Sequence, residues 1–162
     1  MVATRNWQLT GLGNGRFALD CFLSPVQIQE AGGLWRDINP SLRALGGGLW
    51  GPTDTPYHLE IDRDGGRKFF PDKGDRGKYV SLPGLALFRG LPRTIAGNTI
   101  TLRGSFFDIV TRAENTRVKL SIIFRSAPPF TTLSFPVDTV GLALGQLLGR
   151  SNLVDAKREE PH

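Results

Sequence analysis

Cysteine is almost absent from this sequence, because Cys21 is the only one among 162 residues. A single thiol excludes an intrachain disulfide and a cysteine-rich zinc site, which need several cysteines at set spacings. Histidine is nearly as rare, with His58 and the terminal His162 as the two examples. A zinc ion needs three or four ligands, and no second histidine lies near His58 in the chain. We therefore expect no metal and no cofactor.

Long apolar runs are also missing. No stretch approaches the ~20 apolar residues that span a membrane. Residues 1–17 lack the continuous apolar core of a signal peptide. These two absences predict a chain that is made in a reducing cytoplasm and that has no membrane partner.

Glycine and proline are plentiful, with 20 and 11 residues, and they fall between short apolar runs. This spacing is typical of an all-β protein with many turns. We expect an antiparallel β-sandwich or jelly-roll-like domain with long loops over residues 1–137. A C-terminal helix or arm would follow over 138–150, and a disordered tail over 151–162.

The N-terminal part predicts a hairpin. Asn14-Gly15 is a strong signal for a two-residue turn with left-handed backbone angles, and it separates two apolar segments. Every second residue from Phe17 to Leu23 is apolar or cysteine, so these residues share one face of a strand. We expect that face to lie against the core, with Cys21 as a small core residue.

A second β region begins near Asn98. Residues 99–103 alternate between polar and apolar side chains, and residues 117–125 contain the clearest period-2 pattern in the chain, with Val118, Leu120, Ile122 and Phe124 on one face. Residues 131–137 predict a shorter final strand.

Residues 30–56 are rich in glycine and proline, which predicts a long loop, with one helical turn over residues 41–45. A loop of this length is functional or is ordered by a neighbour. It contains Trp35 and Trp50, which would either fold back over a sheet edge or contact a partner, as tryptophans often do in interfaces.

The region 138–149 has a different pattern. Asp138 would cap a short helix that places Leu144 and Leu147 on one side. Glycines at positions 141, 145 and 149 weaken a soluble helix by about 1 kcal/mol each, so an extended arm is the alternative. In either form, this element would be stabilised by contact with something else.

The stretch HLEIDRDGGRKFF, residues 58–70, raises the question of a catalytic or metal site. His58, Glu60 and Asp62 would share one face of a strand, opposite to Leu59 and Ile61. A turn follows, and a return strand brings cations opposite these acids, where each cross-strand pair contributes about 0.2–1 kcal/mol. The pattern favours a solvated, charged hairpin over a metal site.

Other catalytic patterns are incomplete. Residues 11–15 are glycine-rich but precede a strand, whereas nucleotide-binding glycines precede a helix. Residues 74–78 are too short for a phosphate-binding loop, and Ser105 lacks the flanking glycines of a nucleophile elbow. We therefore expect a protein that is not an enzyme.

The charge distribution favours protein docking over nucleic-acid binding. The chain carries a net charge of +5, but residues 62–78 contain six basic and four acidic side chains, a local net of only +2. The interleaved acids would repel phosphate, whereas a mixed-sign surface suits protein partners.

Four segments together resemble small virion structural proteins of tailed bacteriophages: LWRDINP, PYHLEIDRDGG, RKFFPDKGD and TRVKLSIIFRSAPPF. The chain is most similar in style to head decoration, or cement, proteins. This resemblance implies a non-enzymatic β-domain in the virion that docks on the major capsid protein and stabilises the lattice, commonly as a homotrimer. Tail, baseplate or fibre-adaptor proteins are the alternative.

The residues add a hypothesis for the contacts. Symmetric oligomers bury elements that one subunit cannot cover, and the exposed candidates here are Trp35, Trp50, Arg63, Arg67, Leu144 and Leu147. The rival hypothesis is a carbohydrate-binding β-sandwich, in which Trp35 or Trp50 stacks on a sugar ring.

Overall fold

The computed structural model of this protein describes residues 2–84, 88–127, 129, 132 and 134–142. Within these residues the chain forms fifteen β-strands, all in antiparallel pairs, and no α-helix. The predicted all-β, antiparallel, sandwich-like fold is confirmed. A helix that could cross a membrane was not found in the described part of the chain.

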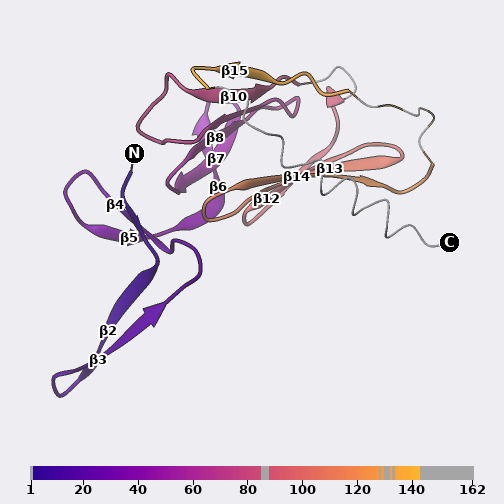
Figure 1. Cartoon of the computed structure of the whole chain (residues 1–162). Coiled ribbons are helices and arrows are strands. Elements are labelled where there is room, and N and C mark those ends of the chain that lie inside the picture. Colours follow the sequence, from indigo (N-terminus) through magenta and orange to yellow (C-terminus); the bar gives the residue numbers. More distant parts are fainter. Residues whose placement is uncertain (1, 85–87, 128, 130–131, 133, 143–162) are drawn as a thin grey trace.

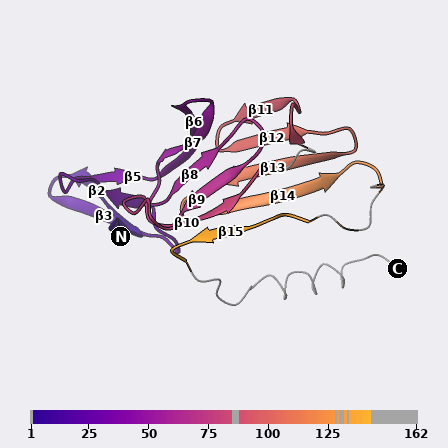
Figure 2. The same cartoon turned by 90° about the horizontal axis from the view of Figure 1, so that it is seen from above.

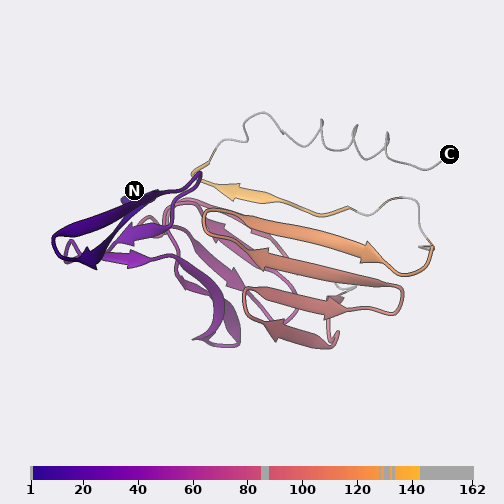
Figure 3. The ribbon, with the colours of Figure 1, turned by 90° about the horizontal axis from the view of Figure 1, so that it is seen from below.

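Two large sheets form the body of the protein. The first has six strands in the order β15-β10-β9-β8-β7-β6, and the second has four in the order β11-β12-β13-β14. Figures 2 and 3 show the two sheets as layers of the same body. The strands of the body are β6 (Asn39–Gly46), β7 (Leu49–Asp54), β8 (His58–Ile61), β9 (Arg67–Phe70), β10 (Tyr79–Leu82), β11 (Arg93–Ala96), β12 (Thr99–Arg103), β13 (Phe107–Ala113), β14 (Val118–Phe124) and β15 (Asp138–Val140).

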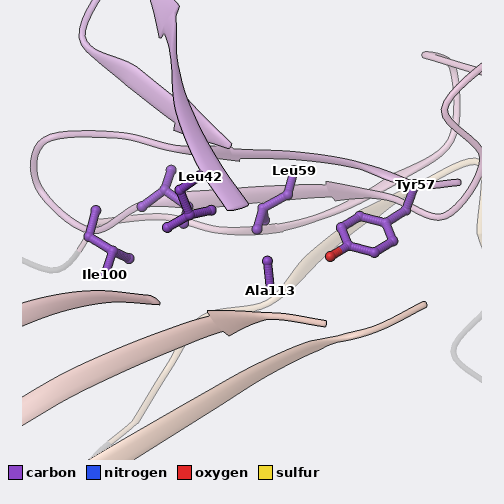
Figure 4. Close-up of a cluster of buried hydrophobic side chains, with 6 residues drawn as sticks. Leu42, Tyr57, Leu59, Ile100 and Ala113 are labelled. Atoms are coloured by element: carbon purple, nitrogen blue, oxygen red, sulfur yellow. The ribbon is translucent and has the colours of Figure 1, made fainter. Parts of the chain in front are cut away.

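The core lies between these sheets. Leu42 of β6 and Leu59 of β8 face Ile100 of β12 and Ala113 of β13, and each is 7% exposed or less. Figure 4 shows these side chains pointing toward one another from two layers of ribbon. Burial of each large aliphatic side chain contributes about 1.5–3 kcal/mol. The alternating apolar residues of β8 and β12 therefore determine which face of each sheet points inward.

A small sheet and a hairpin precede the body. The small sheet joins β1 (Thr4–Arg5), β4 (Gln27–Gln29) and β5 (Trp35–Asp37), in the order β1-β4-β5. The hairpin joins β2 (Trp7–Gly13) and β3 (Arg16–Cys21). Figure 1 shows this hairpin leading away from both large sheets. We call residues 7–21 the arm.

The turn of the arm agrees with its prediction. Asn14 and Gly15 have φ angles of 52° and 74°, which is the left-handed pair that a two-residue hairpin turn requires. The strand prediction over residues 117–125 is also confirmed by β14, which pairs with β13 along its whole length.

The long loop predicted over residues 30–56 is wrong. These residues contain β5, β6 and β7, and residues 41–45, where we expected a helical turn, belong to β6. Three glycines, 46–48, have positive φ and form the turn between β6 and β7. The glycines thus mark a tight turn between two strands, and pairing with β8 stabilises a segment whose composition resembles a loop.

Two predictions near the C-terminus also need correction. Among the described residues of 131–137 no strand is present; the last strand in the described part of the chain is β15, which pairs with β10. Asp138 begins that strand and does not cap a helix, so residues 138–140 take the extended alternative. The predictions for residues 143–162, including Leu144 and Leu147, lie outside the described residues.

Candidate functional site

The charged hairpin places two of its three candidate residues together. His58 and Glu60 both lie on the outer face of β8, with 3.0 Å between His58 Nε2 and Glu60 Oε1. Arg76 Nη1 lies 3.9 Å from the same carboxylate oxygen. Leu59 and Ile61 point into the core at 1% exposure each, which confirms β8 as a half-buried strand.

Burial lowers the pKa of His58 below its ordinary value of 6.5, and the hydrogen bond to Glu60 opposes this shift only in part. The imidazole is therefore neutral at pH 7, and its Nε2–H donates to the Glu60 carboxylate. A neutral histidine held in this way acts as a fixed hydrogen-bond donor and not as a surface cation.

Asp62 does not join this pair. Its Oδ1 accepts hydrogen bonds from the backbone N–H groups of Asp64 and Gly66, at 2.9 and 2.7 Å. The carboxylate thus stabilises the turn between β8 and β9, as short acidic side chains often do. Within the described residues, no group of three or more His, Cys, Asp or Glu side chains is arranged to hold a metal ion.

Aromatic and cationic side chains surround the His58–Glu60 pair. The rings of Phe70 and Tyr79 lie 5.2 Å apart, with Arg76 over Phe70 and Lys68 over Tyr79. Together with Leu45 and Leu49 these residues line an open depression of about 570 Å³. We call it the outer basin. The Phe70 ring is only 6% exposed, so the basin presents the half-buried ring of Tyr79 together with hydrogen-bonding groups, a combination that suits a polyhydroxylated ligand.

The two candidate tryptophans lie in different settings. The Arg5 guanidinium lies 4.4 Å from the ring of Trp35 and 4.4 Å from that of Trp7, so one cation links the base of the arm to the small sheet. Trp50 is half-buried and packs against the core cluster. Both tryptophan rings therefore contact other parts of the same chain, as in the alternative in which they fold back on the protein.

The remaining candidates, Arg63 and Arg67, differ in exposure. Arg63 is exposed at the hairpin tip. Arg67 is only 7% exposed, and its Nε donates to Thr111 Oγ1 at 2.7 Å. Burial lowers the pKa of Arg67 to about 10, with Asp62 opposing the shift. Arg67 is therefore a cation inside the body and not part of the exposed tip.

Arg67 lies beside an apolar groove of about 440 Å³ between the two large sheets. Beyond Arg67, Thr116 and Arg117, its lining is apolar: Leu59, Phe69, Val80, Leu82, Val118 and Leu120. All of these except Leu59 are only half-buried. The groove therefore exposes to solvent the kind of surface that normally forms a core.

The arm has an apolar face that the structure leaves uncovered. The register pairs Trp7 with Cys21, Leu9 with Leu19, and Gly11 with Phe17, so the side chains of Trp7, Leu9, Phe17, Leu19 and Cys21 share one face. Leu9, Leu19 and Phe17 are 55%, 60% and 65% exposed. The opposite face carries Gln8, Thr10, Ala18 and Asp20.

This finding corrects the prediction for Cys21, which is exposed and not a core residue. Three of the predicted residues, Phe17, Leu19 and Cys21, do lie on one side of β3, whereas Leu23 lies beyond the end of this strand. No described part of the chain packs over them. The alternation in the sequence thus predicted which residues share a face of β3, but it did not predict that this face is exposed.

Comparison with known proteins adds no assignment: no family model, no curated protein and no solved structure matches this chain.

Proposed function

We propose that this chain is a non-enzymatic structural protein of a tailed-phage virion, which docks on the capsid lattice and stabilises it as a decoration protein. The observation that supports the proposal is the arm, with its exposed apolar face. The largest contiguous apolar patch on a soluble monomer, typically roughly 300–600 Å², is often a functional surface. A ribbon that presents such a face away from the body is suited to docking.

The energetics favour docking in many copies. The apolar face of the arm exposes on the order of 400 Å² of apolar surface, which corresponds to a gross gain of about 10 kcal/mol on burial. Association costs roughly 4–15 kcal/mol, so a single arm contact is close to balanced. On a lattice, a first contact raises the effective concentration of the subunit for the next contact, so several weak contacts together give stable binding.

Particles purified from the phage that encodes the chain test this proposal. Mass spectrometry should find the chain in a fixed ratio to the major capsid protein, and immunogold labelling should place it on the head. Labelling on the tail would favour the tail, baseplate or fibre-adaptor alternative. Absence from purified particles would contradict a virion role.

A second candidate function is carbohydrate binding at the outer basin. The observation in its favour is the half-buried Tyr79 ring, which packs on Phe70 and lines the same basin as the His58–Glu60 hydrogen bond. A glycan array should then show binding that Tyr79→Ala removes and that Leu19→Asp, on the distant arm, leaves intact. An array without any binding would exclude this function for the glycans it displays.

A further inference from the structure

The groove between the two large sheets has a buried cation in its lining. Arg67 of β9 is 7% exposed, and a guanidinium has five N–H donors. Its Nε donates to the Thr111 hydroxyl and its Nη1 to the carbonyl oxygen of Gly65, and both acceptors are neutral. Among the described residues, Nη2 has no hydrogen-bond partner and Arg67 forms no ion pair. Buried charges in proteins are usually paired with an opposite charge, so Arg67 is an unusual cation.

The acids of the neighbouring elements interact with other groups. Asp62 favours the charged form of Arg67, but its carboxylate accepts two backbone N–H groups of the turn between β8 and β9. Glu114 forms an ion pair with Arg117, which is the other arginine in the groove lining. Arg117 therefore already has a carboxylate partner, and an additional carboxylate in the groove would find its partner in Arg67.

The rest of the groove is suited to an alkyl chain. Its volume of 440 Å³ lies in the range of roughly 300–1,000 Å³ that is typical of small-molecule sites. A methylene group takes up about as much space as a water molecule, for which ~30 Å³ is the share of liquid volume. The groove therefore has room for a chain of at most roughly 15 carbon atoms. Half-buried apolar side chains such as Val80 and Leu120 would cover that chain.

We propose that this groove binds a medium-chain fatty acid, with the carboxylate on Arg67 and the alkyl chain against the apolar lining. Pairs of arginine and carboxylate form strong, charge-assisted hydrogen bonds, and burial of the alkyl chain removes apolar surface from water. A cation alone would bind any small anion, and an apolar groove alone would bind any apolar chain. The combination selects an anion that has an alkyl chain. This binding goes beyond the virion role and does not depend on it, because it uses a different surface from the arm.

Titration calorimetry of the full chain with dodecanoate, below the concentration at which it forms micelles, is the first test. We expect saturable binding of one dodecanoate per chain. Dodecanol has the same alkyl chain without the charge, and its affinity should be at least about tenfold lower, because hydrogen bonds between charged groups are the stronger ones. No saturable binding of dodecanoate, or equal affinity for the two compounds, would overturn the inference. This comparison uses the wild type alone, so it does not depend on the folding of a variant.

Two arginine variants then identify the carboxylate partner. Arg67→Gln should lower the affinity for dodecanoate at least about tenfold and abolish the preference over dodecanol. Arg63→Gln is the matched control, because it removes the same charge from the exposed tip of the same hairpin, and it should bind dodecanoate like the wild type. Equal losses in the two variants would mean that the net charge of the protein attracts the ligand, and the proposed site would be wrong.

Photolabelling locates the alkyl chain. With a dodecanoate that has a diazirine at the end of its chain, we expect labels on the segments that line the groove, residues 67–82 and 116–120. Labels on residues 7–21 would show that the chain adsorbs to the exposed apolar face of the arm, and they would overturn the inference. A protein that associates with phosphatidylcholine vesicles but does not bind free dodecanoate would also contradict it, because the occupant would then be a membrane surface.

Discussion

Two hairpins of this protein have apolar residues at alternate positions, but only one of them buries its apolar face. In the hairpin of β8 and β9, the alternate residues Leu59 and Ile61 are 1% exposed, because the second sheet covers them. In the arm, the alternate residues Leu9 and Leu19 are paired just as regularly and remain 55% and 60% exposed. Alternation determines which side chains share a face, and it leaves open what covers that face.

The turns differ in the same sense. The body hairpin uses the Asp62 carboxylate, which accepts two backbone N–H groups within the turn. The arm uses backbone geometry alone, with Asn14 and Gly15 at positive φ. A two-stranded hairpin without a third strand or a covering layer is marginally stable in water. The body hairpin has neighbouring strands on both sides, whereas β2 and β3 pair only with each other among the described residues.

The largest expected difference between the two hairpins lies in their leucines. Leu59→Ala should lower the free energy of unfolding by about 2–5 kcal/mol, because it leaves a cavity in the core. Leu19→Ala should change it by less than about 0.5 kcal/mol. Urea unfolding of the dilute, monomeric protein measures both, and equal losses would show that the arm packs on its own body.

The two regions also differ in the space around their glycines. A Cβ at Gly51 of β7 would lie 1.9 Å from the carbonyl oxygen of Leu59, whereas a Cβ at Gly11 of the arm would meet only Phe17 Cε1 at 3.9 Å. Gly51→Ala should therefore cost about 3 kcal/mol through overpacking. Gly11→Ala should be neutral or stabilising by about 0.5 kcal/mol. The midpoints of urea unfolding for both variants measure these stability changes. A Gly51→Ala variant as stable as the wild type would contradict the close approach of β7 and β8.

The turn of the body hairpin should respond less strongly. Asp62→Ala removes the acceptor for Asp64 and Gly66 and should lower stability by about 1 kcal/mol. Asp62→Asn is the control, because its amide oxygen can still accept, and it should lose less. Two variants with identical losses would mean that charge, and not hydrogen bonding, stabilises the turn.

The smallest expected effect concerns pH. The pKa of His58 is lowered by burial from 6.5, so the unfolded chain binds a proton more readily than the folded one. Stability should therefore fall as pH decreases from 6.5 toward the lower folded-state pKa, and level off below it. His58→Gln should lack this part of the pH dependence. Equal slopes for the two proteins in unfolding measured across this pH window would place His58 outside the buried environment.

Much of the fold was predictable from local patterns. The Asn14-Gly15 turn, the strand Val118–Phe124 and the half-buried β8 each depend on residues within one hairpin. Residues 30–56 were not predictable in this way, because β6 and β7 are stabilised by pairing with one another and with β8. Their glycines suggested a loop where the chain makes a tight turn.

The candidate site residues also differ in whether local sequence predicts their environment. The proximity of His58 and Glu60 follows from strand periodicity alone, and the structure adds the hydrogen bond between them. The exposure of Cys21 and the burial of Arg67 depend on which layers meet in space. Local sequence contains no information on such distant contacts, so both residues were assigned to the wrong environment.

The sequence by itself determined the all-β class, the turn of the arm and the set of side chains on each strand face, because these follow from backbone angles and a period of two residues. Only the tertiary structure decided which faces are covered. It places Leu59 under a second sheet and leaves Leu19 in solvent, because burial depends on the packing of layers that are far apart in the chain.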